Sequence, residues 1–150
     1  MLPPAVLSNL AYTPPLDVSV GLILAIYAVY GTIAFTAVIL LEAIALRLLR
    51  WGSFARSLLD SFLINLASSL VGVLCALFGW IAWLPDGVVG TLFSLSLAFA
   101  LSVLVETVVL VLIRGRPLRP SASAAVVANA ASYTGLALLA FVLFVLSAPR

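Results

Sequence analysis

Residues 34–50 read AFTAVILLEAIALRLLR, and residues 98–114 read AFALSVLVETVVLVLIR. The two stretches carry the same polar and aromatic landmarks at an offset of 64 residues, and the correspondence continues beyond them without an insertion. The matching pairs are Phe35 and Phe99, Glu42 and Glu106, Arg50 and Arg114, Asn65 and Asn129, and Ser68 and Ser132. Leucine and alanine match by chance in so apolar a chain, whereas ionisable and amide side chains in register do not. The pattern indicates a tandem duplication of one helical hairpin.

The composition is that of an integral membrane protein. Of the 150 residues, 65% are hydrophobic and 8% are charged, and such a chain cannot cover a water-soluble surface. A spanning helix needs about 20 apolar residues, so the length leaves room for four spans and for no soluble catalytic domain. The sequence predicts an all-α four-helix bundle of two tandem, parallel hairpins related by a pseudo-two-fold axis. The predicted spans are residues 18–46, 58–84, 88–113 and 122–147.

The predicted domains follow from these spans. The first hairpin covers residues 18–84 and the second covers residues 88–147. Residues 1–17 hold two Pro-Pro pairs and no basic segment, so we expect an extended or interfacial leader on the outer side, not a cleavable signal peptide. Because each hairpin crosses the membrane twice, the second copy enters it in the same orientation as the first.

Arginines mark one side of the membrane. They are Arg47, Arg50 and Arg56 around the first connection, and Arg114, Arg116 and Arg119 around the third. By the positive-inside rule both loops are cytoplasmic and both termini lie outside. Topology and anionic headgroups explain these arginines, with Trp51 expected in the headgroup belt and Asp60 expected to pair with Arg56 one turn earlier.

The absence of lysine beside abundant Ala, Leu, Val and Arg suggests a GC-rich genome, and hence the cytoplasmic membrane of a prokaryote.

Glutamates and asparagines lie at matching depths in the predicted spans. Counted from the arginines at the helix ends, Glu42 and Asn65 lie about 12 to 14 Å deep, at about 1.5 Å of rise per residue. Glu106 and Asn129 lie about 12 to 15 Å deep by the same count. We therefore expect each hairpin to bring a carboxyl and a carboxamide together. The predicted intramembrane polar cluster is Glu42, Asn65, Ser68, Glu106, Asn129 and Ser132.

Two main classes of function fit these glutamates. A charged side chain at a helix centre costs roughly 2.5 to 3.5 kcal/mol on insertion scales, and one interhelical hydrogen bond returns about 0.6 to 2 kcal/mol. The carboxyls are therefore protonated donors to the asparagines, are ionised beside water or arginine, or bind something else. The first hypothesis is a small non-catalytic accessory, scaffold or assembly protein whose Glu–Asn pairs fasten each hairpin. The alternative is an ion- or proton-coupled transporter or channel with Glu42 and Glu106 as its polar site, and partner docking is a third interpretation.

Missing residue types argue against an enzyme. The chain has no histidine and no lysine, which removes Ser-His and Ser-Lys nucleophile pairs, haem ligation by His and His-based metal sites. We expect no catalytic residues, no cofactor and no metal. The net charge of +2 describes membrane orientation, so we expect no nucleic-acid partner. The expected partners are the lipid bilayer and, as open alternatives, a larger membrane complex or a homo-oligomer.

Overall fold

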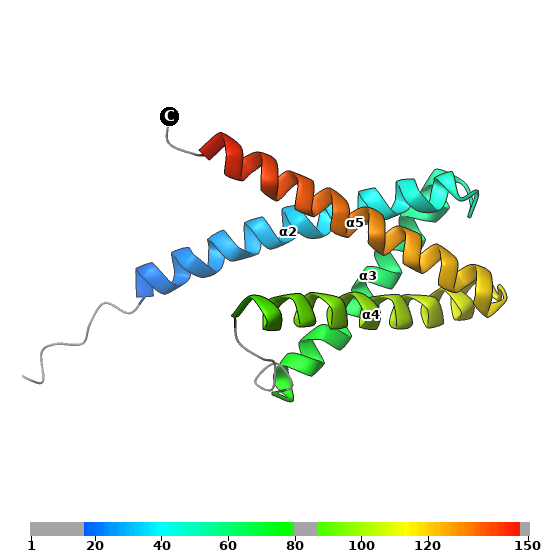
Figure 1. Cartoon of the computed structure of the whole chain (residues 1–150), viewed down its shortest axis with the longest axis horizontal. Helices are drawn as coiled ribbons and strands as arrows, with labels where there is room; N and C mark the ends of the chain where they lie inside the picture. Colours follow the sequence, from blue (N-terminus) through cyan, green and yellow to red (C-terminus); the bar gives the residue numbers. More distant parts are fainter. Residues whose placement is uncertain (1–16, 80–86, 148–150) are drawn as a thin grey trace, which may run out of the picture. The chain divides into compact units, whose positions relative to one another are not determined.

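The computed structural model describes residues 17–79 and 87–147, and within these ranges it is all-helical (Figure 1). The helices are α2 (Asp17–Leu48), α3 (Phe54–Leu77), α4 (Gly87–Arg114) and α5 (Leu118–Ser147). All four are long and apolar enough to cross a bilayer. The prediction of an all-α, multi-pass membrane protein is therefore confirmed. The predicted leader, apart from Asp17, lies outside the described residues.

Local capping sets where two of the helices begin. α3 starts at Phe54 because Ser53 is its N-cap, and the Ser53 side chain accepts a hydrogen bond from the Arg56 amide at 3.4 Å. α5 starts at Leu118, directly after Pro117, and accommodates Pro120 in its first turn, where a missing amide hydrogen is tolerated. Both helices begin about one turn before the apolar stretches that marked the predicted spans.

The α2–α3 connection contains a residue in the left-handed region. Arg50 has a φ of 56°, a conformation that usually falls to glycine at the end of a helix. Its amide donates to the Arg47 carbonyl at 3.0 Å, and the Trp51 amide donates to the Leu46 carbonyl at 3.0 Å. The α4–α5 connection uses Gly115 instead, with a φ of 61°. These two tight turns close the two hairpins.

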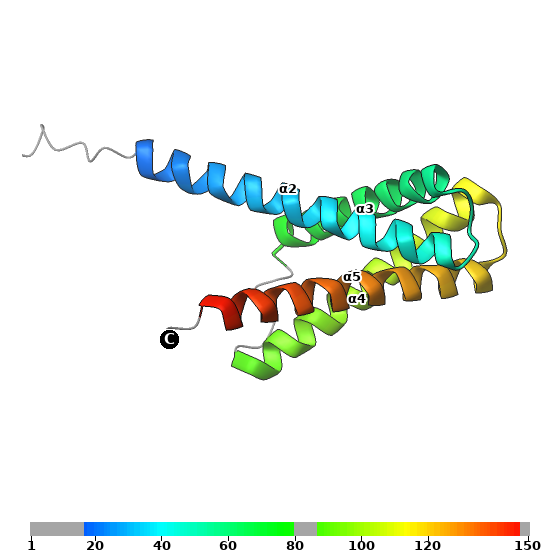
Figure 2. The ribbon, with the colours of Figure 1, turned by 90° about the horizontal axis from the view of Figure 1, so that it is seen from above.

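The chain divides into two units, residues 1–35 and 36–150. In the first unit the described part is the beginning of α2, and from Leu22 onward its apolar side chains and the tyrosines Tyr27 and Tyr30 are largely exposed, as suits a lipid-facing helix. The second unit is a bundle of the remainder of α2 with α3, α4 and α5. Within it, the α2–α3 and α4–α5 connections lie at the same end in both views (Figures 1 and 2).

The buried core of the second unit lies towards that end, and small residues bring the helices close there. The core residues are Leu46, Trp51, Ile64, Leu110, Ala124, Ala125 and Ala128. Farther along α5, away from the connections, α5 packs closely on α2 at Gly135. A Cβ atom added to this glycine would lie 2.6 Å from the Leu41 Cδ1 atom, which is too close for a side chain. Small side chains allow such close approach between membrane helices.

Candidate functional site

Glu42 lies in the interior of the bundle and accepts hydrogen bonds from two other helices. Its side chain is 1% exposed. From α3, the Asn65 Nδ2 atom donates to Glu42 Oε2, and the Ser61 hydroxyl donates to the same oxygen at 3.3 Å. From α5, the Ser132 hydroxyl donates to Glu42 Oε1 at 3.0 Å. Both carboxyl oxygens are therefore occupied.

Glu106 occupies the corresponding place on α4. It is also 1% exposed, and the Asn129 Nδ2 atom donates to its Oε2 atom at 2.5 Å. Ser68 on α3 lies beside Glu106, and its hydroxyl donates to the Asn65 carbonyl at 3.2 Å. Each glutamate thus meets the asparagine of its own hairpin and a serine of the other hairpin. The structure brings together all six residues of the predicted cluster and adds Ser61, so that the polar cluster comprises Glu42, Ser61, Asn65, Ser68, Glu106, Asn129 and Ser132.

Both asparagines are held in place by their own helices. The Asn65 Nδ2 atom donates to the Ser61 carbonyl at 2.9 Å, and the Asn129 Nδ2 atom donates to the Ala125 carbonyl at 3.0 Å. These bonds span one helical turn and fix the direction of each carboxamide. The glutamates therefore meet donors that are already oriented, and little side-chain freedom is lost when the helices associate.

The serine hydroxyls each have a second acceptor. Ser132 Oγ lies 3.0 Å from both Glu42 Oε1 and the Asn129 carbonyl, and Ser61 Oγ lies 2.9 Å from the Ile39 carbonyl on α2. A hydroxyl carries one proton and can also accept. When it donates to the carbonyl, its oxygen is available to a protonated glutamate, and when it turns, it donates to an ionised one. The polar cluster can therefore satisfy Glu42 in both protonation states.

The number of donors changes the energy balance for Glu42. An interhelical hydrogen bond contributes on average about 0.6 kcal/mol and at most about 1.7 kcal/mol, so three contribute about 2 to 5 kcal/mol. That matches the roughly 2.5 to 3.5 kcal/mol that a charged residue costs at a helix centre on insertion scales. The predicted cluster already contained Asn65 and Ser132, and the structure adds Ser61 as the third donor.

A second polar network lies at the end of the bundle that carries the connections. Asp60 on α3 is 1% exposed and forms a two-point ion pair with Arg114 on α4, with Nε–Oδ2 at 2.8 Å and Nη2–Oδ1 at 2.5 Å. The Trp51 indole nitrogen donates to Asp60 Oδ2 at 3.1 Å. The predicted pairing of Asp60 with Arg56 was therefore wrong. Such a planar two-point contact is the geometry that favours arginine over lysine.

Several of the predicted cytoplasmic anchors bind protein groups. Arg116 Nη2 donates to the Trp51 carbonyl at 2.9 Å, and the guanidinium lies 4.1 Å from the centre of the Trp51 ring. Arg47 Nη1 donates to the Gly52 carbonyl at 3.3 Å. Trp51 is 4% exposed, so its ring packs against protein groups, while its predicted place at the depth of the headgroup belt stays a prediction. Arg50, Arg56 and Arg119 have exposed side chains.

The side chains of these two networks can form hydrogen bonds and ion pairs and can exchange protons. Among the residues that the structure describes, no three His, Cys, Asp or Glu side chains are grouped as metal ligands would be. Comparison of the chain with known protein families, with curated proteins and with solved structures found no match.

Proposed function

We propose that this multi-pass membrane protein is non-catalytic and acts as an accessory, scaffold or assembly component, with the polar cluster as the element that fastens its helices. The observation that carries the proposal is the reciprocal contact of each glutamate. Glu42 joins Asn65 of its own hairpin to Ser132 of the other, and Glu106 binds Asn129 of its own hairpin and lies beside Ser68 of the other. One side chain thereby holds a hairpin together and holds the two hairpins against each other.

A tandem duplication of a hairpin gives this arrangement a physical origin. Each copy inserts as a unit and needs an internal fastening, which the Glu–Asn pair supplies. Two identical hairpins that associate about a two-fold axis then present the same serine to each other's glutamate. Polar side chains are well suited to this task in lipid, where apolar surfaces provide no hydrophobic driving force between helices.

The orientation and location form part of the proposal. We propose that both arginine-rich loops face the cytoplasm, that both termini lie outside and that the membrane is the cytoplasmic membrane of a prokaryote. Six arginines lie at the end of the bundle with the connections and support this orientation. The absence of histidine and lysine supports a non-catalytic role, and the exposed apolar faces are compatible with a larger membrane complex or a homo-oligomer.

The experiment that tests the proposal compares folding with ion flux. Glu42→Gln and Glu106→Gln should keep the protein monodisperse in detergent, because a carboxamide can accept from asparagine and donate to serine. Asn65→Leu with Asn129→Leu should lose folded protein, because the carboxyls then lack their oriented donors. Liposomes containing wild-type protein should show no proton or monovalent cation flux above empty liposomes. Flux that Glu42→Gln abolishes in a folded protein would reject the fastening role.

A proton-coupled permeation protein is the second candidate, and two observations favour it. Glu42 and Glu106 are both buried in one polar cluster, and each is 1% exposed. The hydroxyl of Ser132 can serve either protonation state of Glu42. An intramembrane carboxyl with these properties can exchange a proton, and a pH-sensitive dye inside the liposomes is the direct readout.

A further inference from the structure

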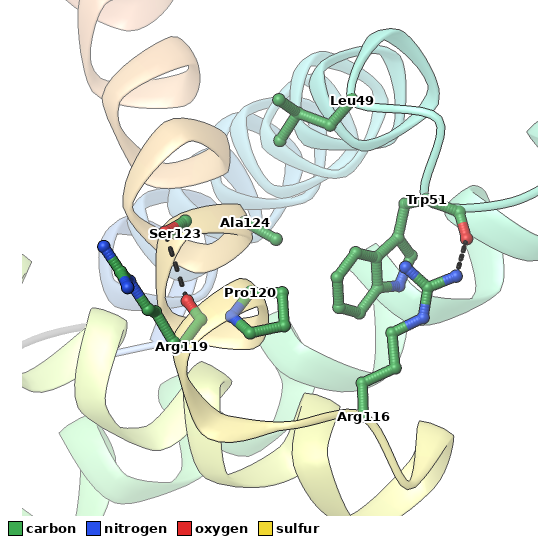
Figure 3. Close-up of a pocket in the computed structure, with 7 residues that line it drawn as sticks. All are labelled: Leu49, Trp51, Arg116, Arg119, Pro120, Ser123 and Ala124. Carbon is green, nitrogen blue, oxygen red and sulfur yellow. Dashed lines mark hydrogen bonds between the residues drawn. The ribbon is translucent and has the colours of Figure 1, made fainter.

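A pocket of about 440 Å³ opens beside the α2–α3 and α4–α5 connections (Figure 3). One wall comes from the α2–α3 connection, and the other comes from the α4–α5 connection and the start of α5. The lining residues are Leu49, Trp51, Arg116, Arg119, Pro120, Ser123 and Ala124. Figure 3 shows Arg119 and Arg116 on either side of Pro120 and Ala124, with the Trp51 ring next to Arg116. The pocket thus combines two cations with apolar walls.

The charge around this pocket is not balanced by the protein. Six arginines flank the two connections, and Asp60 is the acidic residue that the structure places among them. Both Asp60 oxygens are taken by Arg114. Within residues 17–79 and 87–147, neither Arg116 nor Arg119 forms a salt bridge. Arg116 uses one of its five N–H groups on the Trp51 carbonyl and keeps others free to donate.

The offset of 64 residues shows that the pocket wall has an alanine where the first hairpin has an aspartate. Asp60 corresponds to Ala124, whose methyl group forms part of the pocket wall. In the first hairpin a carboxylate at this register accepts from Arg114 and Trp51. In the second hairpin the carboxylate is missing and a pocket lined by arginines is present. Among the described residues no carboxylate pairs with Arg116 or Arg119 at this pocket, which leaves their charge available to an oxyanion from outside the protein.

We propose that this pocket binds the phosphate of an anionic phospholipid. Guanidinium groups donate paired hydrogen bonds to phosphate oxygens, and Arg116, which lies against the Trp51 ring, keeps N–H groups free for this, while Arg119 adds its charge at the other edge of the pocket. Leu49, Pro120 and Ala124 offer apolar contact to the glycerol and the first acyl carbons. The pocket lies at the ends of membrane-spanning helices, where headgroups lie, and basic pockets between such helices are a recognised class of lipid site. The apolar walls favour a lipid over free phosphate.

Native mass spectrometry of the detergent-solubilised protein with phosphatidylglycerol tests this proposal. Each arginine near a headgroup contributes about fivefold in affinity, so Arg116→Gln with Arg119→Gln should weaken binding by about 25-fold. Arg47→Gln with Arg56→Gln removes the same charge from outside the pocket and should weaken it less than about threefold. Equal losses in the two variants, or no preference for phosphatidylglycerol over phosphatidylcholine, would overturn the proposal.

Two further measurements complete the test. The first asks whether the phosphate belongs to a lipid or is free, and the second asks whether the site lies at Ala124. Inorganic phosphate at millimolar concentration should leave lipid binding unchanged, and displacement of the lipid would show a site for free phosphate instead. Ala124→Asp supplies the missing carboxylate and should weaken phosphatidylglycerol binding at least tenfold. If the unfolding midpoint shows that this buried substitution disturbs the fold, Ser123→Asp at the exposed neighbour makes the same comparison. Unchanged binding in a folded aspartate variant would contradict the assigned position.

Discussion

Ser132 on α5 donates a hydrogen bond of 3.0 Å to Glu42 on α2, although 90 residues separate the two along the chain. Ser68 on α3 in turn lies beside Glu106 on α4. The two contacts are related by the same 64-residue offset that relates the two halves of the sequence. Each glutamate therefore lies against a serine of the other hairpin. Removing one glutamate affects contacts in both hairpins.

Glu42→Gln should change stability far less than Glu42→Met. Glutamine can accept from Asn65 and donate to Ser132, so we expect its unfolding free energy to stay within about 1 kcal/mol of wild type. Methionine has a similar length but removes all three hydrogen bonds and leaves the Asn65 donor without a carboxyl, which should cost about 2 to 4 kcal/mol. Reversible unfolding in mixed micelles measures both. Equal losses for the two variants would mean that Glu42 must be ionised.

The ion pair between Asp60 and Arg114 should be strongly coupled. Arg114→Gln leaves a buried carboxylate whose remaining hydrogen-bond donor, among the described residues, is the Trp51 indole, and we expect a loss of about 3 kcal/mol. Asp60→Asn with Arg114→Gln should cost less than the sum of the single changes, because no unpaired charge remains. The same unfolding assay gives these values.

Arg56→Gln is the control for that comparison. Arg56 is exposed and lies one turn before Asp60. From the sequence alone, Arg56 is therefore the expected partner of Asp60, the place that Arg114 takes in the structure. We expect Arg56→Gln to change the unfolding free energy by less than about 0.5 kcal/mol. A loss as large as that of Arg114→Gln would show that Asp60 pairs within its own helix.

Arg50→Gly should stabilise the α2–α3 turn relative to Arg50→Ala. Arg50 has a φ of 56°, and a side chain in the left-handed region costs roughly 1 to 2 kcal/mol that glycine does not incur. We expect the glycine variant to be more stable than the alanine variant by about 1 kcal/mol. At Arg47, inside α2, the order should reverse, because glycine weakens a helix by about 1 kcal/mol relative to alanine. Thermal unfolding of the four variants tests the contrast.

The Glu–Asn contacts were predictable because depth in a membrane helix can be counted along the chain. Glu42 and Asn65 lie on consecutive, antiparallel helices, so similar depths from the helix ends place them side by side. The Glu42–Ser132 contact was not predictable in this way. The offset of 64 residues says that the hairpins are alike, but it does not say which faces meet. The repeat does not point to Ser61 either, because the residue 64 positions later is Ala125.

The partner of Asp60 was missed for a related reason. Local helix geometry favours pairs at a spacing of four residues, and Arg56 satisfies that rule. Arg114 lies 54 residues away, on another helix, and reaches Asp60 because the two connections lie at one end of the bundle. Trp51 is buried there by Arg116, which stacks on its ring. Contacts between hairpins depend on packing, which a single sequence does not specify.

The central claim is that the polar cluster fastens the two hairpins to each other. A double-mutant cycle between Glu42→Met and Ser132→Ala measures this directly, with reversible unfolding in mixed micelles as the readout. We predict a coupling energy of about 0.6 to 1.7 kcal/mol, the range of interhelical hydrogen bonds in membranes. A coupling energy of zero, with both single variants folded, would contradict the claim.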